Sequence, residues 1–179
     1  MALAFVLELE QVIFTEEEIR QKVAELGVQI TEDYKGKDLL VVCILKGGAV
    51  FMSDIIRQIK VPLEIDFMSV SSYGVSTTTS GVVRVLRDLD REIAGRHILI
   101  VEDIVDTGLT LSYLRENLLT RKPASLKICT FLDKPSRRKA ELVPDYCGFE
   151  IDDLFVVGYG LDYNERGREF PYIASVKQA

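Results

Sequence analysis

Residues 97–110 read HILIVEDIVDTGLT, and this stretch decides the fold class that we predict for the chain. It begins, after His97, as an apolar run, which is typical of a strand buried on both faces of a parallel sheet. A polar turn comes next, and leucines then recur at helical spacing, at positions 111, 114 and 118. A strand, a tight polar turn and a helix start make an anion site, because free amides and the helix dipole favour negative charge there.

The carboxylates of this turn need a different partner from the amides. Glu102, Asp103 and Asp106 would repel a bare phosphate, whereas sugar hydroxyls and a divalent metal suit them. Two alternatives are an acidic strand end that only caps a helix or borders a solvated loop, and an Asp-x-Asp-x-Thr phosphotransfer turn. Three carboxylates beside the Thr-Gly-Leu-Thr run of residues 107–110 argue against the first, and the spacing of the aspartates fits the second poorly.

Residues 101–110, VEDIVDTGLT, resemble the phosphoribosyl pyrophosphate (PRPP) signature of the type I phosphoribosyltransferases. The resemblance implies an α/β fold with a mostly parallel twisted sheet flanked by helices and a small hood from the terminal segments. It also implies that PRPP and Mg²⁺ bind at this turn, with Glu102 and Asp103 facing the ribose and its metal. The residues implied to hold the ribose and its 5′-phosphate are Glu102, Asp103, Asp106, Thr107, Gly108, Leu109 and Thr110.

A second strand-to-helix turn follows the apolar run LLVVCIL of residues 39–45. Lys46 and the two glycines after it form this turn, and a glycine pair also suits a plain connection between a strand and a helix. In the family that the chain resembles, Leu-Lys-Gly-Gly is the pyrophosphate loop, often with a cis peptide before the lysine. The resemblance therefore implies that Lys46 and Gly47 bind pyrophosphate, together with Arg168.

Residues 71–81, SSYGVSTTTSG, are the most polar and least periodic stretch of the chain. A loop of this length in a compact chain is typical of a lid or of a disordered segment. Ser71, Ser72, Tyr73 and Gly74 are similar to the start of the flexible catalytic loop of hypoxanthine-type transferases. That similarity implies a lid, which would keep water from a cationic sugar intermediate.

Residues 155–163, FVVGYGLDY, closely resemble the purine-recognition segment of the hypoxanthine-guanine phosphoribosyltransferases. By residue type alone Phe155 would be a core residue. The resemblance instead implies that Phe155 stacks on the purine and that the backbone of Val156 reads its edge. It further implies that Asp162 borders the purine site and holds a magnesium ion on the pyrophosphate side.

Lys134 follows the apolar run of residues 126–132 and so stands at the carboxyl end of a predicted parallel strand, where open sheets bind ligands. The resemblance implies that Lys134 donates to the 6-oxo group of the purine, since an ammonium can only donate. We expect its neighbours Arg137, Arg138 and Lys139 to be solvated.

Flanking segments supply further elements of the predicted fold. Residues 15–18, TEEE, form a capping box, and the helix after it is expected to reach the residues before Tyr34, with Gly27 either ending or interrupting it. Residues 62–70 alternate in polarity and predict a strand near a sheet edge, with Ile65 on its apolar side and Asp66 on the other.

Composition limits the function classes that remain. The 179 residues are 47% hydrophobic and 28% charged, which indicates one globular domain over residues 1–179. A net charge of −6 argues against a surface for nucleic acid or for an anionic membrane. The three cysteines are odd in number and lack metal-ligand spacing, and residues 1–7 lack the form of a signal peptide, so we expect a cytoplasmic protein.

The resemblance as a whole implies purine salvage: Mg²⁺-dependent transfer of the 5-phosphoribosyl group from PRPP to hypoxanthine or guanine, giving IMP or GMP and pyrophosphate. In that reaction we expect Asp106 to be the general base that takes the proton from the purine N7. The family also suggests a homodimer or homotetramer. Two alternatives stay open: a related transferase for xanthine or a pyrimidine, and a nucleotide-sensing regulator on the same fold that binds RNA.

Overall fold

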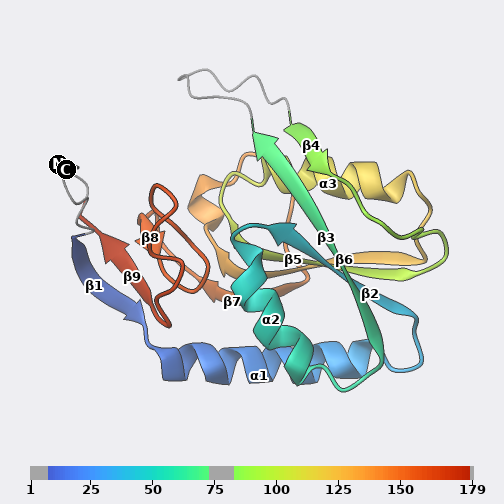
Figure 1. Ribbon diagram of the computed structural model, residues 1–179, viewed down its shortest axis with the longest axis horizontal. Helices are drawn as coiled ribbons and strands as arrows, with labels where there is room; N and C mark the ends of the chain where they lie inside the picture. The colour runs from blue at the N-terminus through green and yellow to red at the C-terminus, as the bar shows by residue number, and fades with distance from the viewer. Residues whose placement is uncertain (1–7, 73–82, 178–179) are drawn as a thin grey trace.

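The computed structural model describes residues 8–72 and 83–177, and its main feature is a six-stranded sheet (Figure 1). Its strands are β2 (Leu39–Leu45), β3 (Leu63–Ser72), β4 (Val83–Arg87), β5 (His97–Val105), β6 (Ser125–Asp133) and β7 (Tyr146–Glu150). They lie in the order β4-β3-β2-β5-β6-β7, with every neighbouring pair parallel except β3 and β4. The predicted α/β fold with a mostly parallel sheet is confirmed.

Three α-helices cover the two faces of this sheet: α1 (Glu16–Asp33), α2 (Gly48–Gln58) and α3 (Leu109–Leu119). Alternate residues of β2 and β5 point to opposite faces, so one face packs against α1 and α2 and the other packs against α3. β2 is therefore apolar throughout, and β5 is apolar and buried from Ile98 to Val101, as the sequence predicts for central strands; β5 then continues through Glu102 and Asp103 to Val105. Within the described ranges, no helix is long and apolar enough to cross a membrane.

A separate three-stranded sheet joins the two ends of the described chain (Figure 1). It consists of β1 (Leu9–Phe14), β8 (Val156–Val157) and β9 (Ile173–Val176), with β9 antiparallel to both of its neighbours. This sheet is the hood that the resemblance implies. Within it the backbone of Val156, a predicted purine-binding residue, pairs with Ser175 of β9, and β1 pairs with the other side of β9.

The sequence predictions for α1 are right at its start and wrong in its middle. The Thr15 amide donates to Glu18 Oε2 at 2.8 Å, and the Glu18 amide donates to Thr15 Oγ1 at 3.3 Å, which confirms the capping box. Gly27, however, neither ends nor interrupts the helix. It is buried against Gln58, and a Cβ atom at position 27 would lie 2.3 Å from the Cβ of Gln58. Gly27 therefore lets α1 and α2 approach closely.

The strand predicted over residues 62–70 is β3, which lies second from the edge of the sheet. Its inner side is the one that carries Asp66 and Met68, whereas Ile65 on the other side is 43% exposed. Asp66 is buried because its Oδ2 accepts the amides of Asp90 and Arg91 at 2.9 and 3.2 Å. The strand and its place near the sheet edge are therefore as predicted, and the buried carboxylate of Asp66 is a feature that the alternation in polarity does not show.

We expect Gly27→Ala to lower the stability of the fold. Alanine would favour a helix interior by about 1 kcal/mol, but overpacking against Gln58 typically costs about 1–3 kcal/mol. The net loss should be about 1 kcal/mol, measured as the free energy of unfolding in urea. Val28→Ala, on the exposed side of the same helix, is the matched control, and a Gly27→Ala protein more stable than the parent would refute the packing argument.

Candidate active site

Three groups of predicted site residues lie at the carboxyl ends of three neighbouring strands of the large sheet, β2, β5 and β6. β5 pairs with β2 on one side and with β6 on the other, with Val101 opposite Cys43 and Val105 opposite Asp133. The turns after these three strands therefore meet at the carboxyl edge of the sheet. This is the edge at which open α/β sheets bind their ligands.

The turn between β5 and α3 encloses a cavity of about 140 Å³. Gly108 caps α3 with a left-handed backbone (φ +75°), so the helix begins at Leu109, two residues before the predicted leucine stripe. Thr107 and Thr110 line the cavity, whereas the Leu109 side chain is exposed and only its backbone belongs to the turn. The cavity is lined by Glu102, Ile104, Val105, Asp106, Thr107, Gly108, Thr110 and Leu111. Free amides at the start of α3 make it suitable for a phosphate group.

Glu102 and Asp103 are adjacent carboxylates at the end of β5. Burial, and next the charge of Asp103, raises the pKa of Glu102 well above its usual range. Asp103 Oδ1 accepts the Ile104 amide at 2.8 Å, while its other oxygen faces Gly47 so closely that a Cβ there would lie 1.5 Å from it. A cation brought by a ligand would stabilise the charged form of Glu102.

These carboxylates suit a magnesium ion that is bound by oxygen atoms of both the protein and a substrate. Oxygen atoms are the ligands that Mg²⁺ prefers, and it commonly binds through one or two carboxylates together with substrate phosphates. Glu102, Asp103 and Asp162 do not gather into one cluster, since no group of three acidic, histidine or cysteine ligands forms among the described residues. Protein ligands alone would therefore not complete a coordination shell here.

The predicted pyrophosphate residues converge on an acid that sequence reasoning missed. Lys46 Nζ lies 2.7 Å from Glu165 Oε2, and Arg168 Nη2 lies 3.3 Å from Glu165 Oε1. The hydrogen bond from Lys46 is the main reason that the pKa of Glu165 is lowered. Arg168 also pairs with Asp162 at 2.6 Å, so two cations from distant parts of the sequence are brought together.

The backbone of the Lys46 turn also packs against the segment that carries Arg168. The peptide bond between Leu45 and Lys46 is cis, as the resemblance led us to expect. A Cβ atom at Gly160 would lie 2.2 Å from the carbonyl oxygen of Gly47, so these two glycines permit the close approach. The carbonyl of Gly160 in turn accepts Arg168 Nη1 at 2.7 Å.

The predicted purine-binding residues lie in two segments, directly after β6 and around β8. Lys134 is only 7% exposed, and its Nζ donates to the Leu154 carbonyl at 2.6 Å. Phe155 is 39% exposed, so its assignment to the core by residue type is wrong, and its ring meets Tyr163 edge-on at 5.3 Å. Val156 is buried in β8. An exposed aromatic face beside a buried ammonium suits a flat, polar ring.

Two arginines that we expected to be solvated contact the loop after β5. Arg137 Nε donates to Asp106 Oδ1 at 3.1 Å, and Arg138 Nη1 donates to the Asp106 carbonyl at 3.1 Å. Arg138 also pairs with the buried Asp133. Arg137 and Lys139 are nevertheless exposed, as expected, and Arg138 is half-buried. The sequence shows only that this stretch is basic. The contacts of the two arginines with Asp106 depend on how residues 134–140 fold back onto the loop after β5.

The predicted lid falls largely outside the described residues. Ser71 and Ser72 are the last two residues of β3, whereas Tyr73 and Gly74 belong to the range that is not described. The lid therefore stays a prediction.

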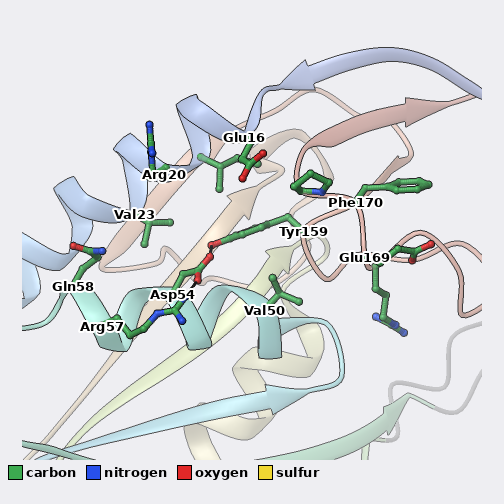
Figure 2. A pocket seen from close by; sticks show the side chains of 13 residues that line it. Glu16, Arg20, Val23, Val50, Asp54, Arg57, Gln58, Tyr159, Glu169 and Phe170 are labelled. Carbon is green, nitrogen blue, oxygen red and sulfur yellow. Dashed lines mark hydrogen bonds and ion pairs between the residues drawn. The ribbon is translucent and has the colours of Figure 1, made fainter.

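A larger cavity of about 480 Å³ lies away from the turn after β5, between α1, α2 and residues 159–171 (Figure 2). Figure 2 shows Tyr159 reaching across it toward Asp54, whose Oδ2 accepts the phenol at 2.7 Å. Among the predicted site residues only Arg168 lines this cavity. It adjoins the pyrophosphate residues and does not contain the strand ends on which the site is built.

Comparison with known proteins agrees with this geometry. Residues 12–164 match the model of the phosphoribosyl transferase domain family. The hypoxanthine-guanine phosphoribosyltransferase of Bacillus subtilis is 54% identical over 96% of this chain and 96% of its own length. The hypoxanthine phosphoribosyltransferase of Escherichia coli is 51% identical over 93% of this chain and 94% of its own length. A crystal structure of the Staphylococcus aureus hypoxanthine phosphoribosyltransferase superposes with a TM-score of 0.92 at 51% identity, covering 95% of this chain and 92% of that one.

The mostly parallel sheet, with its helices and its small terminal sheet, is the fold of the type I phosphoribosyltransferases. The extent of the sequence identity then fixes the branch: this chain belongs to the hypoxanthine-guanine phosphoribosyltransferase family. It is an enzyme, a pentosyltransferase of purine salvage.

We expect Gly47→Ala to weaken PRPP binding without unfolding the protein. The new Cβ would lie 1.5 Å from Asp103 Oδ2, so the Asp103 side chain would have to turn away from its present position. Misplacing such a group should raise the KM for PRPP roughly tenfold. The measurement is steady-state kinetics, with Val50→Ala in α2 as the control. An unchanged KM would show that the position of Asp103 does not matter for PRPP.

Proposed function

We propose that the chain transfers the 5-phosphoribosyl group from PRPP to hypoxanthine or guanine, giving IMP or GMP and pyrophosphate. The observation that carries this proposal is the adjacency of β2, β5 and β6, whose carboxyl ends supply the Lys46 turn, residues 102–110 (the end of β5, the turn after it and the start of α3) and Lys134. Each turn matches one part of the reaction: the leaving group, the transferred sugar phosphate and the accepting base.

The 5′-phosphate of PRPP binds in the cavity at the start of α3. The backbone amides of residues 107–110 and the hydroxyls of Thr107 and Thr110 hold it, and the helix dipole favours its charge. Glu102 and Asp103 bind the ribose hydroxyls, and their negative charge favours the cationic sugar that forms as the bond to pyrophosphate breaks.

Mg²⁺ is the cofactor that we propose for this site. Glu102 and Asp103 would hold it together with oxygen atoms of PRPP, and Asp162 would hold an ion on the pyrophosphate side. Bound Mg²⁺ would neutralise part of the charge on the leaving pyrophosphate. The position of Glu102 supports the assignment, because its carboxylate is adjacent to that of Asp103 in β5 and lines the cavity at the start of α3.

Lys46 and Arg168 bind the leaving pyrophosphate. In the structure described here both cations face Glu165, so we propose that pyrophosphate takes the place of this carboxylate. Both partners of the Lys46 pair are well exposed, so this exchange costs little. The Gly47 amide adds a donor at the same position.

The purine stacks on the exposed face of Phe155, with its edge against the Val156 backbone, in a site that Asp162 borders. Lys134 donates to the 6-oxo group, which favours an oxopurine over an aminopurine. Asp106 takes the proton from N7 as the purine attacks the sugar carbon. We also propose that Ser71, Ser72, Tyr73 and Gly74 begin a lid that excludes water during this step.

The decisive experiment is an assay of pyrophosphate release from PRPP with hypoxanthine, guanine, xanthine, adenine and a pyrimidine. We expect release with hypoxanthine or guanine, and its loss when EDTA removes Mg²⁺. Release only with xanthine or a pyrimidine would favour the related transferase, and no release with any base would refute the proposal. A regulator that binds RNA is disfavoured by the net charge of −6, and an RNA mobility-shift assay tests it directly.

Three properties of the whole chain complete the proposal. We propose that residues 1–179 act as one phosphoribosyltransferase domain, because Lys134 at the end of β6 donates to the Leu154 carbonyl, two residues before β8 of the small sheet. We propose a cytoplasmic enzyme, since Cys43, Cys129 and Cys147 are all free thiols. The family resemblance supports a homodimer or homotetramer without nucleic-acid or membrane partners, and sedimentation equilibrium measures the subunit number.

A further inference from the structure

The segment after β6 folds back onto the turn after β5. The Lys134 amide donates to the last carbonyl of β5 at 2.9 Å, and the amides of Lys139 and Ala140 donate to the Thr107 carbonyl at 2.9 and 3.2 Å. Residues 134–140 therefore form a second wall beside the proposed phosphate turn. Their side chains are held at fixed places along the proposed sugar and purine sites.

Arg137 uses this placement to bridge two carboxylates. Its Nε donates to Asp106 Oδ1 at 3.1 Å, and its Nη1 donates to Asp153 Oδ2 at 3.3 Å. Asp153 Oδ1 in turn lies 3.8 Å from the Nζ of Lys134. Alternating charges thus run without a break from the proposed general base to the proposed purine-recognition lysine.

This row of charges is poorly suited to a role in stability. The side chains of Arg137 and Asp106 are 47% and 42% exposed, and ion pairs between exposed groups contribute little to the free energy of unfolding. Arginine nevertheless presents several donors in a rigid planar fork, which lets one side chain orient two carboxylates at once. Its geometry here therefore matters more for orientation than for stability.

The contact with Arg137 involves only one of the two carboxylate oxygens of Asp106. Oδ1 accepts the hydrogen bond from Arg137, and among the described residues no hydrogen bond involves Oδ2. A general base works best when a third group fixes its orientation, because the proton must be within hydrogen-bond reach. One oxygen held by Arg137 leaves the other available to accept a proton.

We propose that Arg137 is a positioning residue for the transfer reaction: it orients the Asp106 carboxylate toward the purine and, through Asp153, ties it to Lys134. The inference rests on the proposed role of Asp106 as the general base. It assigns a function to a side chain that touches neither PRPP nor the purine.

The test compares Arg137→Gln, Arg137→Lys and Lys139→Gln in the full-length enzyme. Arg137→Gln should lower kcat roughly tenfold, with the KM for PRPP and the thermal midpoint nearly unchanged. Arg137→Lys keeps a positive charge near Asp106 but loses the planar fork of donors, so its kcat should lie between those of Arg137→Gln and the parent. Lys139→Gln removes one positive charge two residues away and should have the parent kcat. Asp153→Asn should raise the purine KM about threefold.

A double mutant separates this inference from the proposed function. If Arg137 acts through Asp106, Arg137→Gln should have no further effect on kcat in an Asp106→Asn protein. Equal losses in both backgrounds, or an Arg137→Gln kcat within about twofold of the parent, would overturn the role of Arg137 alone. A parental kcat for Asp106→Asn itself would instead refute the base assignment on which the inference rests. An unchanged purine KM in Asp153→Asn would remove the link to Lys134.

Discussion

Asp106→Asn should lower kcat by about 10³-fold while the KM for PRPP stays within about threefold of the parent value. Asparagine has nearly the same shape as aspartate, and its carbonyl can still accept the hydrogen bond that Arg137 Nε donates to Asp106 Oδ1. The turn that surrounds the proposed 5′-phosphate site is built from backbone amides and threonine hydroxyls, which the substitution does not touch. What is lost is the capacity to take a proton from the purine.

The loss must be measured in the chemical step. Release of product can limit kcat in enzymes of this kind, so single-turnover rates of IMP formation should accompany the steady-state values. Glu116→Gln is a suitable control, because it removes one negative charge from the exposed side of α3. A parental single-turnover rate for Asp106→Asn would exclude Asp106 as the general base.

The parts of the site that could be predicted from sequence are those that lie within one short stretch. Residues 97–110 contain a strand, a turn and a helix start in immediate succession, so local patterns decide the structure of the whole stretch. The capping box at Thr15 is likewise complete within four residues. Lys134, whose role comes from the family resemblance, lies at the carboxyl end of β6, as the sequence predicts.

What could not be predicted depends on side chains that meet across long sequence distances. Glu165 pairs with Lys46 although the two residues are 119 positions apart in the sequence, and the sequence around neither residue predicts the ion pair. Arg137 reads as one of three adjacent basic residues until residues 134–140 are seen to fold back onto the turn after β5. Gly27 is similar, because only the position of Gln58 explains why a glycine stays inside a helix.

Lys134→Ala should weaken the use of 6-oxopurines selectively. Lys134 is 7% exposed, and removal of its ammonium takes away the donor that we assign to the 6-oxo group and leaves the Leu154 carbonyl without its partner. Loss of a hydrogen bond at a site built to make it should lower kcat/KM for hypoxanthine about 10²-fold or more. The PRPP site that we propose is built from other turns, so the KM for PRPP should change little.

A second variant distinguishes recognition from packing. Lys134→Met keeps most of the buried stem of the side chain but removes the charge, so a purely structural role would be rescued by methionine and a recognition role would not. The ratio of kcat/KM for hypoxanthine to that for adenine is the decisive readout, because an ammonium donor favours an oxo group over an amino group. We expect this ratio to fall in both variants. If pyrophosphate binding were weakened as much as purine binding, Lys134 would belong to the leaving-group site, and purine selection would have to rest on the backbone around Val156.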